Sequence, residues 1–158
     1  MNAPESTVPD SDIFVPNIRP DCTDELTAAL GQRIMVIDGA MGTAIQRDRP
    51  DEAGYRGDRF TEWPTALQGN NDLLTLTQPQ IIEGIHREYL EAGADILETN
   101  TFNANAVSLS DYDMADLAVE MNFESARIAR AACDKYSTPD KPRFVCGALG
   151  PTPKTASI

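Results

Sequence analysis

Three short apolar runs divide the chain into repeating segments. They lie at about residues 33–38, 95–101 and 143–149, and each ends in polar or small residues. Continuous apolar runs of this length are typical of strands that are buried on both faces, as in parallel sheets. Because α/β folds place their active sites at the carboxyl ends of such strands, the residues that end these runs are the first candidates for a functional site.

Between the runs, apolar residues recur at the spacing of a helix. This periodicity predicts long helices over about 77–92 and 113–135, and short ones over 23–31, 40–47 and 103–110. The inward stripes expected for the two long helices are Ile81, Ile82, Ile85 and Tyr89, and then Leu117, Met121, Ile128 and Ala132.

Polar residues mark where several of these helices should begin and end. Thr77 and Gln80 have the spacing of a capping box, and Gly93 stands where the same helix should stop. Thr23 is expected to cap the first short helix, and Gly31 to end it.

The order strand, helix, strand, helix, strand predicts an α/β fold with parallel strands and right-handed crossovers. Three such strands would leave both sheet edges bare, so we expect further strands to complete the sheet. The segment 49–75 is a long loop, of a length that is more often functional than accidental. Residues 1–22 hold four prolines among acids and predict a disordered or loosely packed leader, followed by a domain over 23–158.

Charge and hydropathy exclude several classes of function. The formal net charge of the 158 residues is -12, which argues against nucleic acid or an anionic membrane as a partner, because phosphates would be repelled. No apolar run approaches the length of a transmembrane helix, and no secretory signal is visible. Cys22, Cys133 and Cys146 are widely spaced, which fits free thiols in a reducing, cytoplasmic compartment and suggests no metal site.

Asp38 is the strongest single candidate for a binding residue. A carboxylate at a strand end can pair with the ammonium of an amino-acid substrate. Gly39 and Gly42 would let backbone N–H groups approach the substrate carboxylate at the helix start that follows. The alternative is that Asp38 caps that helix or shapes a tight Asp-Gly turn.

A second polar strand end offers a wall for the same site. In a strand, Glu98 and Asn100 would point to one face, and Thr99 and Thr101 to the other. Phe102 could pack on the aliphatic part of a substrate. The alternatives are that Asn100 and Thr101 satisfy loop backbone groups, and that Phe102 fills the core.

For several other residues a structural role is favoured. Asn70, Asn71 and Asp72 could line the same site, but a turn-forming role is favoured. His86 is expected on the solvated surface of its helix, and Cys146 is expected to be a small buried hydrophobe.

Six motifs occur in order and with natural spacing. They are residues 33–43, 55–58, 67–72, 89–95, 98–102 and 147–152. Together they closely resemble the start of the homocysteine-binding domain of the cobalamin-dependent methionine synthases, from about residue 26 to the last residue.

This resemblance implies a (β/α)8 barrel of the TIM type, of which only about the first three strand–helix units are present. It also implies zinc, bound by three cysteine thiolates, that activates the homocysteine thiol, and methylcobalamin as methyl donor, recharged by methyltetrahydrofolate. Cys133 and Cys146 do not match the zinc ligands of the family, and His86 lacks the neighbours of its cobalamin motif. No catalytic residue or cofactor site is therefore expected within this chain. The expected partners are homocysteine, the remaining barrel strands, and folate- and cobalamin-binding domains.

The resemblance carries over to part of a substrate site only. The residues expected to contact homocysteine are Asp38, Gly39, Ala40, Met41, Gly42, Glu98, Asn100, Thr101 and Phe102. Two alternatives remain open. The chain could be a non-catalytic truncated or split-barrel piece, or belong to a cobalamin-independent thiol methyltransferase of the same superfamily.

Overall fold

The computed structural model describes residues 20–152 and residue 154. The chain divides into two units, residues 1–32 and 33–158. Most of the predicted leader, residues 1–19, lies outside the described residues. In the first unit, α1 (Thr23–Gln32) is preceded by Asp21, whose Oδ1 accepts hydrogen bonds from the Thr23 N–H at 3.0 Å and the Thr23 hydroxyl at 2.7 Å. The expected cap by Thr23 is therefore wrong, because Asp21 supplies the accepting oxygen.

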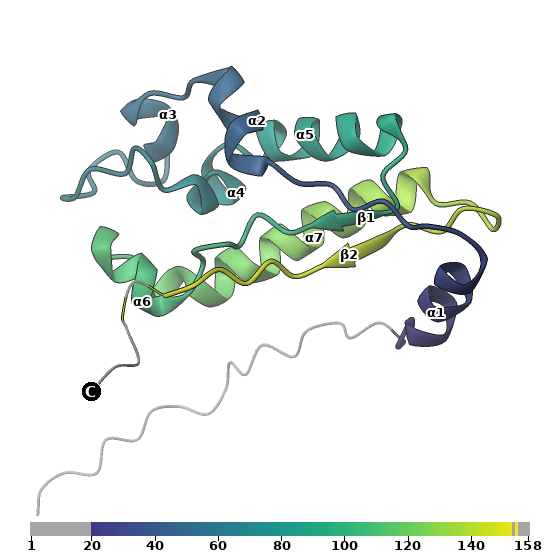
Figure 1. Ribbon diagram of the computed structural model, residues 1–158. Helices are drawn as coiled ribbons and strands as arrows, with labels where there is room; N and C mark the ends of the chain where they lie inside the picture. The colour runs from purple at the N-terminus through teal and green to yellow at the C-terminus, as the bar shows by residue number, and fades with distance from the viewer. Residues whose placement is uncertain (1–19, 153, 155–158) are drawn as a thin grey trace, which may run out of the picture. The chain divides into compact units, whose positions relative to one another are not determined.

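The second unit alternates helices with two short strands (Figure 1). Its elements are, in order, α2 (Met41–Asp48), α3 (Glu52–Arg56), η1 (Asn71–Leu73), α4 (Leu74–Thr77), α5 (Pro79–Ala92), β1 (Ile96–Glu98), α6 (Ala106–Leu109), η2 (Ser110–Tyr112), η3 (Ala115–Leu117), α7 (Ala118–Tyr136) and β2 (Phe144–Cys146). No helix in the part of the chain that the structure describes has the length and hydropathy needed to cross a membrane.

The predicted parallel arrangement is confirmed, but the strands are shorter than predicted. β1 pairs in parallel with β2, with Ile96 opposite Phe144. The predicted first strand makes a single parallel bridge, between Ile37 and Ile96. Upstream of that bridge the Val36 N–H donates to the Asp95 carboxylate at 2.9 Å, so a side chain replaces the ladder there. The strand predicted over 33–38 is therefore wrong as a regular strand.

One face of the sheet packs on the two long helices, which Figure 1 shows alongside β1 and β2. Leu97 of β1 and Val145 of β2 point to this face and meet Leu90 of α5 and Cys133 of α7. On the opposite face Cys146 is exposed. Its expected burial is wrong, because Cys146 follows Val145 and strand alternation turns it away from the helices.

The predicted helical stripes are largely confirmed, with one addition. Ile82 and Ile85 of α5 and Met121 and Ile128 of α7 are buried. The addition is His86, which is fully buried rather than solvated. Its expected exposure is wrong because α5 presents a wider face to its neighbours than the apolar stripe suggested.

The capping box predicted for α5 is also wrong. Thr77 is the last residue of α4, and Gln78 stands at the N-cap of α5 without a side-chain hydrogen bond. Pro79 begins α5, and its fixed φ and missing N–H suit that position. Gly93 ends the helix as predicted, with φ 107°, a left-handed conformation that favours glycine.

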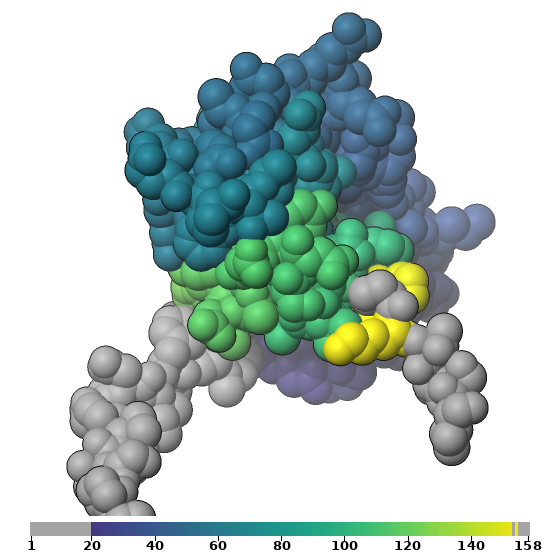
Figure 2. All heavy atoms as spheres, turned by 90° about the vertical axis from the view of Figure 1, so that its left-hand side faces the viewer, coloured from purple at the N-terminus to yellow at the C-terminus, as the bar shows by residue number. Residues whose placement is uncertain are grey.

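The long segment 49–75 is braced by one ion pair. The Glu52 carboxylate accepts the backbone N–H groups of Leu67 and Gln68, and it pairs with Arg56 Nε at 2.7 Å. Arg56 in turn donates to four backbone carbonyls, those of Phe60, Thr61, Trp63 and Thr65. Figure 2 shows this blue segment lying against the green residues that follow β1 in the chain.

Candidate functional site

Asp38 lies between β1 and α5 and does not cap α2. Its Oδ1 accepts the Glu98 N–H at 2.7 Å, and its side chain is 2% exposed. The N-cap of α2 is Ala40, with no side-chain hydrogen bond. The interpretation of Asp38 as a helix cap is therefore wrong, because its carboxylate binds the backbone of the neighbouring strand.

Burial raises the pKa of Asp38 to about 6. The nearby charge of Glu98 acts in the same direction, while the hydrogen bond from the Glu98 N–H opposes it. At neutral pH the residue is therefore a charged carboxylate in a poorly solvated position. A group of this kind beside a strand end is a candidate for binding a cation.

The turn from Gly39 to Gly42 leads into an uncapped helix start. Ala40 has φ 52°, in the left-handed region that only glycine adopts readily, so the turn stores a small strain. The first backbone N–H groups of an α-helix have no partner inside the helix. Since α2 has no side-chain cap, its start at Met41 is a place where a carboxylate can bind.

Glu98 ends β1 with a half-buried side chain. It stands opposite Cys146 in the ladder, and alternation directs both away from the helices. Asp38 and Glu98 are thus adjacent residues of neighbouring segments. The structure brings the Asp38 carboxylate to the Glu98 backbone, whereas the Glu98 side chain points to the opposite face of the sheet.

Asn100 and Thr101 are buried, and their hydrogen bonds connect the end of β1 to neighbouring segments. Asn100 Nδ2 donates to the Asn71 carbonyl at 2.8 Å, and its backbone N–H donates to Ser125 Oγ at 2.7 Å. Thr101 Oγ1 donates to the Ala148 carbonyl at 2.9 Å. The alternation of side chains in β1 stops after Glu98. The contacts of Asn100 and Thr101 therefore agree with the alternative that these residues satisfy backbone groups of loops.

Phe102, unlike Asp38, is not buried, and it is 55% exposed. Its carbonyl accepts the Gly150 N–H at 3.0 Å. A Cβ at position 150 would collide with that carbonyl and with the Phe102 ring, so the close approach requires glycine. Phe102 does not fill the core.

The segment before α4 has the turn-forming role that the sequence favoured. Asn70 Oδ1 accepts the Leu73 N–H at the start of η1, at 3.3 Å. Asn71 Oδ1 accepts the Tyr55 hydroxyl at 2.7 Å. Asp72 is buried and accepts the Asn103 N–H at 3.1 Å, and burial raises its pKa.

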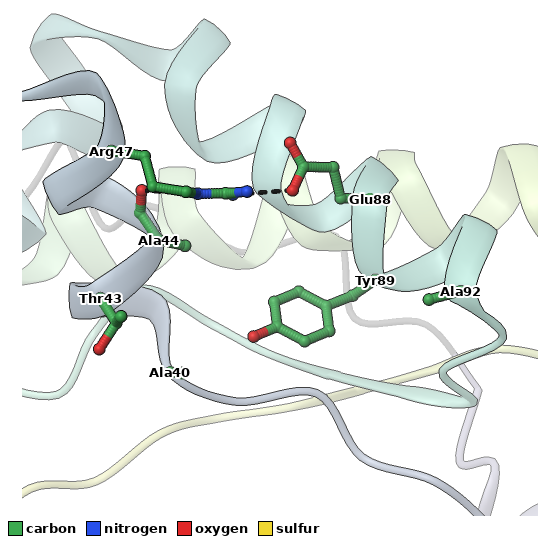
Figure 3. A pocket seen from close by; sticks show the side chains of 7 residues that line it. All are labelled: Ala40, Thr43, Ala44, Arg47, Glu88, Tyr89 and Ala92. Atoms are coloured by element: carbon green, nitrogen blue, oxygen red, sulfur yellow. Dashed lines mark hydrogen bonds and ion pairs between the residues drawn. The ribbon is translucent and has the colours of Figure 1, made fainter.

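A pocket of about 330 Å³ opens between α2 and α5 (Figure 3). An ion pair joins Arg47 and Glu88 across it at 2.7 Å, and the Tyr89 hydroxyl points toward α2. Its lining residues are Ala40, Thr43, Ala44, Arg47, Glu88, Tyr89 and Ala92. Of the predicted site residues it includes only Ala40, so it lies beside the α2 start rather than at Asp38.

The donor groups do not fit a metal site. Among residues 20–152 and 154, no three His, Cys, Asp or Glu side chains lie close enough to hold a metal ion. Cys133 is buried in α7, where burial raises its pKa to about 11. A thiol that resists ionisation is a poor zinc ligand, because zinc binds the thiolate.

His86 is the residue near this site that the sequence interpretation missed. Its Nδ1 lies 3.9 Å from Asp38 Oδ2, and its side chain has no exposed surface. The signal was its spacing, since His86 falls four residues after Ile82 and four before Leu90, both buried. Burial lowers its pKa to about 4, so it is neutral at physiological pH.

Comparison with known proteins assigns the fold and the family. The chain is similar to two structures of the homocysteine methyltransferase MmuM from Escherichia coli, at 21% identity in each case. The metallated form gives a TM-score of 0.61 over 80% of this chain and 41% of MmuM, and the oxidised form gives 0.62 over 79% and 40%. The chain thus spans about two fifths of the length of MmuM and shares the fold of that part. The model of the homocysteine S-methyltransferase family matches residues 35–158, and the chain belongs to this family.

Proposed function

We propose that this chain supplies the homocysteine-recognising part of an enzyme that transfers a methyl group to the homocysteine thiol. Its family supports the reaction class. The observation that carries the assignment of the site is Asp38, a buried carboxylate without a cationic partner. No Lys or Arg among the described residues lies within ion-pair distance of it.

A second buried aspartate shows what a structural carboxylate in this fold looks like. Asp95 precedes β1 and is contacted by three cations, with Arg33 at 2.7 Å, Arg143 at 3.5 Å and Lys141 at 3.9 Å. The hydrogen bonds from Arg33 lower its pKa. Asp38 lies on the other side of the Ile37–Ile96 bridge, and no Lys or Arg among the described residues compensates its charge. A ligand ammonium would provide the missing charge.

The start of α2 complements this carboxylate. An α-amino acid carries its ammonium and carboxylate on one carbon atom, so both groups must be met within a short distance. The turn after Asp38 places the uncapped start of α2, at Met41, three residues farther along the chain. An anion there would accept the free N–H groups of Met41 and Gly42.

We assign the enzyme more finely to the cobalamin-dependent methionine synthase type, acting in the cytoplasm. Methylcobalamin, recharged by methyltetrahydrofolate, would donate the methyl group, and zinc would supply thiol activation. Since the described donor groups do not fit a metal, zinc and cobalamin would be held elsewhere in the full-length protein. The remaining strands of a (β/α)8 barrel would complete the site.

The test is calorimetric titration of the full-length protein with homocysteine. Asp38→Asn keeps the shape of the side chain and its acceptor for the Glu98 N–H, but removes the charge. We expect a loss of about 1.5–3 kcal/mol, or about ten- to a hundredfold in affinity. Asp72→Asn is the matched control, since Asp72 is also buried and accepts a backbone N–H. Equal affinity of Asp38→Asn and the wild type would remove Asp38 from the site.

The pH dependence of homocysteine binding is a second, independent test of the role of Asp38. The ammonium pairs with the charged carboxylate, so binding requires Asp38 to be deprotonated. With a pKa of about 6 in the free protein, affinity should fall as pH drops below about 6. Asp38→Asn should lose this dependence.

A further inference from the structure

His86 has an unusual environment for a buried imidazole. It lies on the buried face of α5 and has no exposed surface. Neither Nδ1 nor Nε2 has a hydrogen-bond partner among the residues that the structure describes. A leucine would fill this position without burying two unpaired polar atoms. The side chain therefore calls for an explanation beyond packing.

A carboxylate oxygen of Asp38 lies near the His86 ring. The distance from Nδ1 to Oδ2 is 3.9 Å, about 1 Å longer than a hydrogen bond. The other carboxylate oxygen, Oδ1, is already held by the Glu98 N–H at 2.7 Å. Since a carboxylate can only accept, a bond between the two requires the tautomer with its proton on Nδ1.

We propose that His86 is a positioning residue for Asp38, whose Nδ1–H completes a hydrogen bond to Oδ2 when homocysteine binds. With both oxygens held, the carboxylate stays charged and oriented toward the substrate ammonium. This inference rests on the proposed function, because it assumes that Asp38 receives that ammonium.

Other groups around the pair do not substitute for His86. Glu98 of β1 is itself an acid, and its charge raises the pKa of Asp38. Cys133 of α7 is near enough for Asp38 to raise its pKa, and its thiol donates to the Phe144 carbonyl at 3.4 Å. His86 is thus the side chain placed to donate to the second oxygen.

Two amide substitutions separate positioning from packing. In His86→Asn the side-chain amide lies at the level of Nδ1 and can donate to Oδ2. In His86→Gln it lies farther out, at the level of Nε2. Both retain a polar side chain in the same place. The experiment measures homocysteine affinity of the full-length variants by calorimetry between pH 5 and 9, together with their melting temperatures.

We expect His86→Gln to bind homocysteine about tenfold more weakly than the wild type, and to lose binding at a higher pH as the solution is acidified. His86→Asn should recover most of the affinity and the wild-type pH profile. A purely structural role would lower both melting temperatures without separating the two variants in affinity or pH profile.

Two results would overturn the inference, and they differ in their meaning. If both His86 variants match the wild type, or weaken binding equally, while Asp38→Asn loses affinity, positioning by Nδ1 is wrong and the proposed function stands. If Asp38→Asn itself binds homocysteine normally, the proposed role of Asp38 is wrong, and the inference about His86 fails with it.

Discussion

Asp38→Asn should make the protein more stable at neutral pH while weakening homocysteine binding. The asparagine oxygen can still accept the Glu98 N–H, which the Asp38 carboxylate accepts at 2.7 Å. The substitution removes a buried charge that no Lys or Arg among the described residues compensates. Binding sites often show this opposition between stability and function.

The magnitude follows from the pKa of Asp38. Each pKa unit corresponds to about 1.4 kcal/mol, so the rise from 3.8 to about 6 amounts to about 3 kcal/mol. Because the folded-state pKa is the higher one, protonation stabilises the folded protein. This stabilisation is complete below pH 3.8 and is lost as pH rises through about 6. Asp38→Asn should therefore equal the wild type near pH 3.5 and exceed it by about 3 kcal/mol at pH 7.

His86 changes the stability of the folded protein with pH in the opposite direction to Asp38. Its pKa falls from 6.5 to about 4 on folding, so its stabilisation is present above pH 6.5 and is lost as pH falls through about 4. In the wild type the two slopes oppose each other between about pH 4 and 6. Relative to the wild type, the stability of Asp38→Asn should therefore rise with pH across this window, and that of His86→Leu should fall.

Urea unfolding followed by circular dichroism between pH 3.5 and 8 measures these curves. Asp140→Asn is the control, since it removes one acidic charge at an exposed position. Lower stability of Asp38→Asn than of the wild type at pH 7 would show that the Asp38 charge does not destabilise the fold. A difference between the two proteins that did not change with pH would show the same.

Three further predictions concern the framework around the site. Arg56→Ala leaves four carbonyls without their donor and should lower the free energy of unfolding by about 1–3 kcal/mol, with faster proteolysis of the segment that it braces; an unchanged cleavage rate would contradict this role. Gly150→Ala drives a Cβ into Phe102 and should cost about 1–3 kcal/mol in denaturant unfolding, whereas a neutral result would mean that the two segments separate freely. At pH 8 a disulfide reagent should modify exposed Cys146 rapidly and buried Cys133 only upon unfolding, because burial raises the pKa of Cys133 to about 11; rapid labelling of Cys133 in Cys146→Ser would show that the α7 contact opens.

The parallel order of the segments and the two long helices could be predicted from the amino-acid sequence. Apolar periodicity is a local property, so the stripes of Ile82 and Ile85 in α5 and of Met121 and Ile128 in α7 could be predicted without knowing their partners. The motifs from residue 33 onward indicated a homocysteine-binding domain, and the match over 35–158 assigns the homocysteine S-methyltransferase family, while the cobalamin-dependent type stays a proposal. The candidate turn after Asp38 was also evident, because an apolar run ending in Asp-Gly is typical of a strand that leads into a turn, although Ile34, Val36 and Ile37 are exposed in the structure.

Only the tertiary structure decided which groups surround Asp38. Its contacts come from Glu98, 60 residues away along the chain, and from His86 on a helix whose buried face is wider than its apolar stripe. The same pairing left Cys146 exposed. Local patterns fix the period of an element but not its rotation or register against its neighbours. Those are set by long-range hydrogen bonds and packing, and on them depend the charge, burial and partners of the site.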